Sequence, residues 1–264
     1  MKRVTGNEEP FSMRFTTLQY TVESHVAVLT LNRPDKRNAI SYELIDELLR
    51  ALDEIAASRA QVLIVTGAGK AFCSGMDLDN LRAITGRTKE QNLEDSHTMA
   101  RLFRSIYEFP RPTISAVNGP AVAGGCGIAT LCDYTLASTE ARFGYTEVRI
   151  GFLPAIVSTF LTRQVGEKQA RDLLLTGRII HPEEALRMGL INELVSSDTL
   201  MPRAYQLAAT LMENSPASLL ATKHLLGKFA CDQLDREIAM AVEANAHIRT
   251  TADFIEGVTS FLEK

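Results

Sequence analysis

The sequence predicts an α/β fold in which strands and helices alternate along most of the chain. Residues 61–67 and 113–117 are continuous apolar or β-branched runs, typical of parallel strands buried on both faces. Between them, leucine and isoleucine recur at helical spacing in residues 42–58. The strand–helix–strand order then repeats, and the chain beyond about residue 197 is almost purely helical in pattern. We therefore expect stacked β/α turns followed by a helical region.

Composition places the chain among ordinary globular proteins. It has 264 residues, of which 45% are hydrophobic and 23% charged, and its formal net charge is −4. That charge gives no broad attraction to nucleic acid or to anionic lipid, so we expect neither as a main partner. No apolar run reaches the length of a membrane span, and no apolar stretch follows the basic N-terminus as it would in a signal peptide. These features predict a cytoplasmic protein.

The four cysteines give no sign of a metal site. Cys73, Cys126, Cys132 and Cys231 show no C-x-x-C spacing, and three of them lie in apolar surroundings. Buried free thiols in a reducing compartment are the expected state. We therefore predict no metal ligands.

The expected elements follow in order along the chain. Residues 15–31 alternate as a two-stranded hairpin that Pro34 ends, and Ser41 is a favourable N-cap for the next helix. A strand over 61–67 leads into a loop over 67–81, a helix over about 92–108, and the strand and helix on either side of Gly124. Beyond them the sequence predicts a strand at 134–138, an irregular segment at 141–157, helices from about 156, at 167–175 and at 181–188, and a short strand before 197.

Three regions are expected from this order. Residues 1–12 form a flexible N-terminal tail, residues 13–197 the core, and residues 198–264 the helical region. The amphipathic stripes of the helical region have too little chain around them for a separate core. We expect them to pack on the main domain or on another subunit.

Residues 112–133, PTISAVNGPAVAGGCGIATLCD, organise the prediction of function. The strand is broken at Asn118-Gly119-Pro120, and Gly124-Gly125 comes directly before an apolar helical run. Glycines there allow a close approach to the main chain, and the first amides of a helix have no intrahelical partner. Such amides suit an oxygen that becomes anionic during a reaction. The alternative is a glycine-rich turn selected only for tight packing.

A second glycine-containing loop, VTGAGKAFCSGMD at residues 65–77, follows the preceding strand. A Rossmann fingerprint would need glycine in place of Phe72, and a P-loop would need four residues where only Ala68 separates Gly67 from Gly69. Both motifs are excluded. What remains is a loop in which Gly75 lets the Met76 amide face outward, as a counterpart to the amide of Gly124.

With both loops in view, the chain resembles the crotonase superfamily, the enoyl-CoA hydratase/isomerase family. The resemblance rests on motifs in the family's order: LNRPDKRNAIS at 31–41, GKAFCSGMDL at 69–78, residues 112–133, ARFGYTEVRIGFLP at 141–154 and LLLTGRIIHPEEALRMGLINELV at 173–195. It implies a crotonase-like spiral of ββα turns with a C-terminal α-helical trimerisation region. It also implies homotrimers or dimers of trimers, with no cofactor besides the coenzyme A of the substrate.

The resemblance further implies an acyl-CoA substrate. Its thioester carbonyl would lie between the main-chain N–H groups of Met76 and Gly124. Lys36 and Arg37 fall where family members approach the phosphates and nucleotide of CoA, although without the motif they would be read as a solvated turn. The segment implied along the adenine and pantetheine path includes Ala71, Cys73, Ser74, Gly75, Asp77 and Leu78.

Glu147 occupies the position of a catalytic glutamate in the family. Water addition to a 2-enoyl thioester, or a double-bond shift, passes through an enolate-like species whose charge two amides would stabilise. Glu147 would then move the proton, and the apolar residues around it should raise its pKa. The alternative is a surface glutamate paired with Arg149.

Gly127 departs from the hydratase pattern. Hydratases of this family carry a second glutamate in a Gly-Gly-Cys-Glu sequence, whereas this chain reads Gly-Gly-Cys-Gly at 124–127. We expect a side chain at position 127 to face the reaction cavity, and a glutamate introduced there to cost little as secondary structure. Other candidate helpers whose places the sequence does not give are Glu94, Asp95, His97 and Tyr145, while Asp133 is expected to order a turn.

The expected function is hydration of a 2-enoyl-CoA, short or branched and of the methylglutaconyl type. The GCGIATLCD and FGYTEVRIGFLPAIV versions of the motifs resemble that branch of the family. One alternative is a Δ3–Δ2-enoyl-CoA isomerase that uses Glu147 as its single base. The alternative of another class is a non-catalytic trimer that binds acyl-CoA or a protein.

Overall fold

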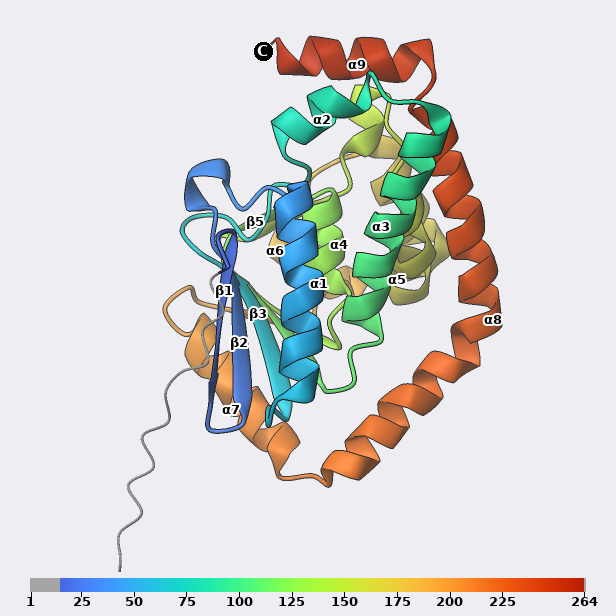
Figure 1. Ribbon diagram of the computed structural model, residues 1–264. Helices are drawn as coiled ribbons and strands as arrows, with labels where there is room; N and C mark the ends of the chain where they lie inside the picture. Colours follow the sequence, from blue (N-terminus) through green and yellow to red (C-terminus); the bar gives the residue numbers. More distant parts are fainter. Residues whose placement is uncertain (1–14, 264) are drawn as a thin grey trace, which may run out of the picture.

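A six-stranded sheet forms the centre of the molecule. The structure, a computed structural model, describes residues 15–263 (Figure 1), so the predicted tail over 1–12 lies outside the described residues. The strand order is β1-β2-β3-β4-β6-β8, with β1 antiparallel to β2 and every other pair parallel. The strands span Leu18–Glu23, Val26–Leu31, Val62–Gly67, Thr113–Val117, Tyr134–Ser138 and Glu193–Val195.

Both faces of this sheet are covered by helices. Leu63 and Val65 of β3 point into a core shared with α1 (Tyr42–Ala57), α3 (Lys89–Tyr107), α4 (Gly124–Thr130) and α5 (Ala155–Thr176). Their neighbours Val62 and Ile64 point to the other face, where α7 (Leu200–Met212) packs. Burial on both faces explains why these strands are continuously apolar. The α/β prediction is confirmed, and α7 is a layer of this core although it follows the boundary expected near 197.

A second, two-stranded sheet was not expected. It consists of β5 (Pro120–Val122) and β7 (Arg142–Gly144), paired in parallel, and β5 is joined to the preceding loop by a bridge between Ala121 and Cys73. The sequence was interpreted as a turn at β5 and as an irregular segment at β7. Three-residue strands are too short to show a period, so their pairing partners decide them.

Helix α2 (Leu78–Ile84) replaces the last four residues of the loop predicted over 67–81. The carboxylate of Asp77 caps it by accepting a hydrogen bond from the N–H of Asp79 at 3.0 Å. Other elements match expectation: Ser41 caps α1, Gly177 ends α5 after a kink at Gly166, and Gly189 ends α6. The remaining short elements are η1 (Pro34–Lys36), η2 (Glu147–Ile150) and α6 (Pro182–Met188).

The last two helices wrap around one side of the core (Figure 1). Helix α8 (Pro216–Ile248) packs on α3 and α5, and α9 (Ala252–Leu262) crosses above α2 and contacts η2. Two glycines allow α9 to lie close to η2. A Cβ built on Gly151 would lie 2.5 Å from the carbonyl oxygen of Asp253, and a Cβ built on Gly257 would lie 2.5 Å from the carbonyl oxygen of Ile150. The C-terminal helices thus pack on their own chain.

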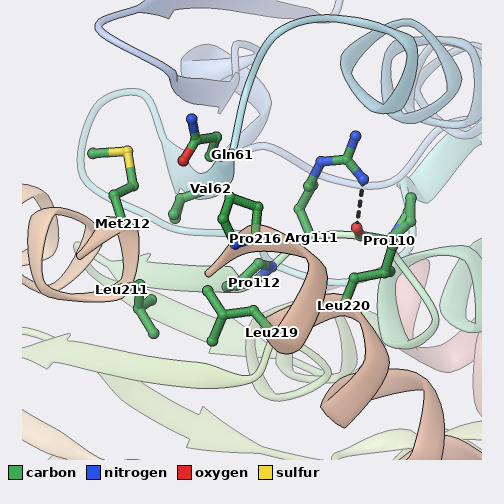
Figure 2. Close-up of a pocket in the computed structure, with 10 residues that line it drawn as sticks. All are labelled: Gln61, Val62, Pro110, Arg111, Pro112, Leu211, Met212, Pro216, Leu219 and Leu220. Atoms are coloured by element: carbon green, nitrogen blue, oxygen red, sulfur yellow. Dashed lines mark hydrogen bonds between the residues drawn. The ribbon is translucent and has the colours of Figure 1, made fainter. Parts of the chain in front are cut away.

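A small apolar notch lies where α7 meets α8 (Figure 2). Its volume is about 10 Å³, which is room for no more than a single water molecule. The notch is at the end of the molecule opposite α2 and α9 (Figure 1). Among the described residues, no helix is both long and apolar enough to cross a membrane. The residues lining the notch are Gln61, Val62, Pro110, Arg111, Pro112, Leu211, Met212, Pro216, Leu219 and Leu220.

Candidate active site

The small sheet brings the predicted site residues to one edge. Three segments run side by side in parallel: the loop at Cys73, strand β5 and strand β7. Met76, Gly124 and Glu147 each follow one of these segments by a few residues. Because parallel segments present their carboxyl ends at the same edge, the three residues emerge together. Residues 76, 124 and 147 are therefore neighbours although they are widely separated in sequence.

Two main-chain amides are left free at this edge. The Ile40 N–H donates to the Gly75 carbonyl at 2.7 Å and the Asp77 N–H donates to the Ile40 carbonyl at 2.9 Å, so the intervening Met76 N–H faces the other way. At the start of α4, the first amide is that of Gly124. Neither amide donates a hydrogen bond within the described part of the chain. Both are available to a substrate oxygen.

A tight contact fixes the two amide-bearing loops against each other. Gly75 has a φ of +89°, and a Cβ built on it would lie 3.0 Å from the Cβ of Ala123 and 3.1 Å from the Val122 carbonyl oxygen. Ala123 has a φ of +52° and a ψ of −129°, a region that a residue with a Cβ rarely occupies. Such strain persists only where surrounding contacts impose it, and here it sits directly before the Gly124 amide.

Glu147 begins η2 and is buried, with 8% of its surface exposed. Its Oε2 atom has no hydrogen-bond partner among the described residues, and burial raises its pKa to about 7. Arg149 is exposed and makes no ion pair with it in the described structure, so the alternative of a surface ion pair is wrong. A buried carboxyl that titrates near neutral pH is suited to accepting and returning a proton.

The chain is similar in sequence to known proteins. The model of the enoyl-CoA hydratase/isomerase family matches residues 21–264. The chain belongs to this family, within the crotonase superfamily. The short-chain-enoyl-CoA hydratase of Clostridium acetobutylicum is 35% identical over 250 residues, covering 92% of this chain and 93% of its own. A Thermus thermophilus protein with a provisional enoyl-CoA hydratase name is 45% identical over 243 residues, covering 92% of this chain and 96% of its own.

A solved structure gives the same result for the fold. An enoyl-CoA hydratase/isomerase from Xanthobacter autotrophicus matches with a TM-score of 0.88 and 29% identity, covering 95% of this chain and 93% of that one. The protein is therefore an enzyme of the enoyl-CoA hydratase/isomerase family with the crotonase-like fold and its C-terminal helical region. Its substrate class is the acyl-CoA thioester.

Apolar side chains surround Gly127, which stands at the position of the family's second glutamate. Gly127 is buried in α4, and a Cβ built on it would lie 2.7 Å from Cγ1 of Val157 and 3.3 Å from Cζ of Phe103. Phe103 also lies beside Gly124, where a Cβ would meet its Cζ at 3.7 Å. The side of the cavity next to Gly127 is thus hydrophobic and closely packed. The expectation of little cost concerned helix propensity alone, and the contacts with Val157 and Phe103 add a packing cost to it.

The residues predicted on the CoA path divide into two groups. Lys36 at the end of η1 and Arg37 directly after it are exposed, with Lys36 3.9 Å from the Asp79 carboxylate, and Leu78 is 53% exposed at the start of α2. Ala71, Cys73, Gly75 and Asp77 are buried and Ser74 is half-buried. The carboxylate of Asp77 is occupied by an ion pair with Arg33 at 2.8 Å. Its side chain therefore holds the loop, whose main chain is hydrogen-bonded to Arg37, Ile40 and Pro120 on either side of the Met76 N–H, which is unpaired within the described residues.

Asn38 is a site-building residue that the sequence reasoning missed. Its side chain is fully buried, accepts a hydrogen bond from the Arg33 N–H at 2.8 Å, and donates to the carbonyls of Ala68 at 2.9 Å and Ala71 at 2.8 Å. It joins η1 to the loop that carries Met76. Its backbone is left-handed, with a φ of +54°, a conformation that asparagine tolerates better than most residues. The signal available in the sequence was therefore an asparagine placed in this turn.

The other candidate helpers lie in different places. His97 and Glu94 are exposed on α3, and Asp95 is buried in ion pairs with Arg87 and Arg249. Tyr145 is fully buried with its hydroxyl 3.2 Å from that of Thr130, which supports the segment leading to Glu147. As expected, Asp133 orders a turn, accepting hydrogen bonds from the Thr113 N–H and hydroxyl.

Proposed function

We propose that this enzyme hydrates a short 2-enoyl-CoA thioester with Glu147 as its proton-transfer group. The observation that supports it is the buried, unpartnered carboxyl of Glu147 at the same edge as the free amides of Met76 and Gly124. The amides would stabilise the negative charge that develops on the thioester oxygen. As the water oxygen bonds to C3, Glu147 takes a water proton, and a proton is returned to C2. This reaction needs no metal and no redox cofactor.

Isomerisation of a 3-enoyl-CoA is the second candidate, and the packing around Gly127 favours it. There, Glu147 would remove a proton from C2 and return it to C4, with the same enolate held by the amides. This route needs one carboxylate and no water. The hydrophobic contact of Phe103 and Val157 at position 127 is consistent with a cavity that excludes a second water-binding group.

One panel of substrates tests both reactions. Unbranched 2-enoyl, 3-enoyl and methylglutaconyl thioesters of CoA are each incubated with the enzyme while conjugated enoyl absorbance is followed. Hydration removes the absorbance of a 2-enoyl substrate, and isomerisation of a 3-enoyl substrate creates it. The methylglutaconyl thioester tests the branched-substrate proposal. Binding without turnover of any substrate would overturn both proposals and leave the non-catalytic alternative.

We also infer a homotrimer, alone or paired as a dimer of trimers, from the outer face of α8. Leu225, Leu226 and Phe229 are 52%, 60% and 74% exposed on neighbouring turns of this helix. Large apolar side chains grouped on one surface indicate a protein contact. The closed symmetry usual for homo-oligomers would cover all copies of this face.

The double substitution Leu226→Glu, Phe229→Glu is expected to convert the assembly into monomers, because it places two charges in the covered face. Light scattering coupled to size exclusion gives the mass directly. Leu175→Glu is the matched control, since Leu175 is 72% exposed on α5. An unchanged mass in the double variant would remove this face of α8 from the interface.

A further inference from the structure

A cluster of buried polar side chains lies between the beginning of α1, the first half of α3 and the end of α8. Asp95 is at its centre and forms ion pairs with Arg249 and, at 3.3 Å, with Arg87. The side chains of Asp95 and Arg249 are only 3% and 2% exposed. The mechanism above uses none of these groups, and burying them is costly unless their hydrogen bonds are satisfied.

Several of these groups are not satisfied. Of the seven buried side-chain nitrogen and oxygen atoms without a hydrogen-bond partner in the described residues, four belong to this cluster: Tyr42 Oη, Asn92 Oδ1, Asn92 Nδ2 and Arg249 Nε. Asn92 is 0% exposed and Arg249 3%. Buried polar groups are nearly always hydrogen-bonded, so such a concentration indicates a binding site for a polar group.

Three connections place this cluster beside the reaction site. Ile40 and Met99 both border Gly124, where a built Cβ would lie 3.2 Å and 4.0 Å from their side chains. Tyr42 follows Ile40 at the start of α1, and Asp95 lies one helical turn before Met99 on the same side of α3.

The third connection runs through Phe152. Its N–H donates to the Glu147 carbonyl at 3.0 Å, and the guanidinium of Arg249 stacks over its ring at 5.1 Å. Asn245, on the turn of α8 before Arg249, donates to the carbonyl of Leu153 at 3.2 Å. The cluster thus lies directly behind the residues that border Gly124 and Glu147.

The charge of the cluster identifies its ligand. Two guanidinium groups face one buried carboxylate, that of Asp95: Arg249 is buried with it, and Arg87, which is 27% exposed, adds a second positive charge at the edge of the cluster. Asp46 and Glu94 are exposed at the rim of a groove of about 360 Å³ on the outer side of the cluster, where water screens them. A surplus positive charge with the unpaired N–H donors of Asn92 and Arg249 matches an anionic oxygen.

We propose that Asn92 and Arg249, with Tyr42, bind a carboxylate at the far end of the acyl chain. The inference rests on the proposed function and specifies its substrate: a short enoyl thioester with a terminal carboxylate. One turn of α3, from Met99 to Asp95, is about 6 Å. At about 1.2 Å of advance per bond along an extended chain, roughly five bonds span it. The acyl chain therefore has five or six carbons.

Binding of saturated thioesters tests this inference without turnover. Calorimetry compares adipyl-CoA with hexanoyl-CoA, which have the same chain length and differ in the terminal carboxylate. Hydrogen bonds to a charged group predict a preference of about tenfold or more for adipyl-CoA. Free adipate is the third arm. Equal Kd values for the two thioesters, or tight binding of adipate alone, would overturn the inference.

Two variants assign the preference to the cluster. Asn92→Leu removes only unpartnered atoms, and Arg249→Lys keeps the charge beside Asp95 but removes Nε. Each should reduce the ratio of the two Kd values to below about threefold, whereas Arg101→Lys on the exposed face of α3 should keep the wild-type ratio. If Asn92 and Arg249 had only a structural role, the variants would shift the Tm or raise the Kd values of both thioesters by the same factor.

The two proposals fail in different ways. If the carboxylate preference is present but no enoyl thioester is turned over, the proposed function is wrong and the cluster is still a carboxylate site. If 2-enoyl substrates are turned over equally well with and without a terminal carboxylate, the cluster is not a specificity site. A preference that survives in both variants would also overturn it.

Discussion

Glu147→Gln is expected to lower kcat by about 10²-fold or more while the enzyme still folds and binds a CoA thioester. Glutamine keeps the shape of the side chain but can neither take nor return a proton, and loss of a general acid/base has an effect of this size. Steady-state rates on the substrate panel and Kd values for a saturated thioester measure the two parts. Activity within a few-fold of wild type would remove Glu147 from the mechanism.

The same variant has an expected signature in stability. Burial raises the pKa of Glu147 from its ordinary value of 4.5 to about 7, so between these pH values the folded state binds more protons than the unfolded state. The free energy of unfolding of the wild type therefore falls as pH rises from about 4.5 to 7. Glu147→Gln should have a higher Tm than wild type at pH 8, and the difference should vanish below about pH 4.5. A lower Tm at pH 8 would contradict this.

Gly127→Glu is expected to destabilise the fold strongly, lowering the Tm by about 10 °C or more. The new side chain would begin 2.7 Å from Cγ1 of Val157 and would place a carboxylate against Phe103 without a partner. Overpacking and a buried unpaired charge each destabilise a core. Thermal unfolding measures the effect. A Tm equal to that of the wild type would show that the space beside Gly127 is larger than its contacts indicate.

Adding Val157→Ala to Gly127→Glu separates the effect of crowding on stability from the effect of a second carboxylate on the reaction. The double variant removes the closest atom, so part of the lost Tm should return, and a second carboxylate would then lie near the cavity. Its hydration of an unbranched 2-enoyl-CoA should exceed that of Val157→Ala alone at least several-fold. If the two rates are the same, position 127 does not face the reacting carbons.

Much of the core could be predicted because local signals there agree with the fold. The strands at 62–67 and 113–117 are buried on both faces and are therefore continuously apolar, and the helix after Ser41 has a cap and a regular stripe. The glycines at 75 and 124 were predicted to free the neighbouring amides, and those amides are unbonded within the described structure. In both cases the cause lies within a few residues of the effect.

The remaining features could not be predicted because the residues that produce them lie far apart in the sequence. The three-residue strands β5 and β7 have no period, and they exist because each is the other's partner. Asp95 and Arg249 are 154 positions apart, and neither gives any local sign of the ion pair. The crowding at Gly127 comes from Val157 and Phe103 on two other helices.

The contact of α9 with η2 also sets an order of events during synthesis. Helix α9 follows the Glu147 segment by about a hundred residues, yet Gly257 lies against Ile150 and Gly151 against Asp253. While a ribosome is still making α8, the segment after Glu147 lacks the cover of α9, and Phe152 lacks its ring contact with Phe254. A nascent chain that already contains both amides and the carboxyl therefore completes the packing beside Glu147 only when α9 has emerged.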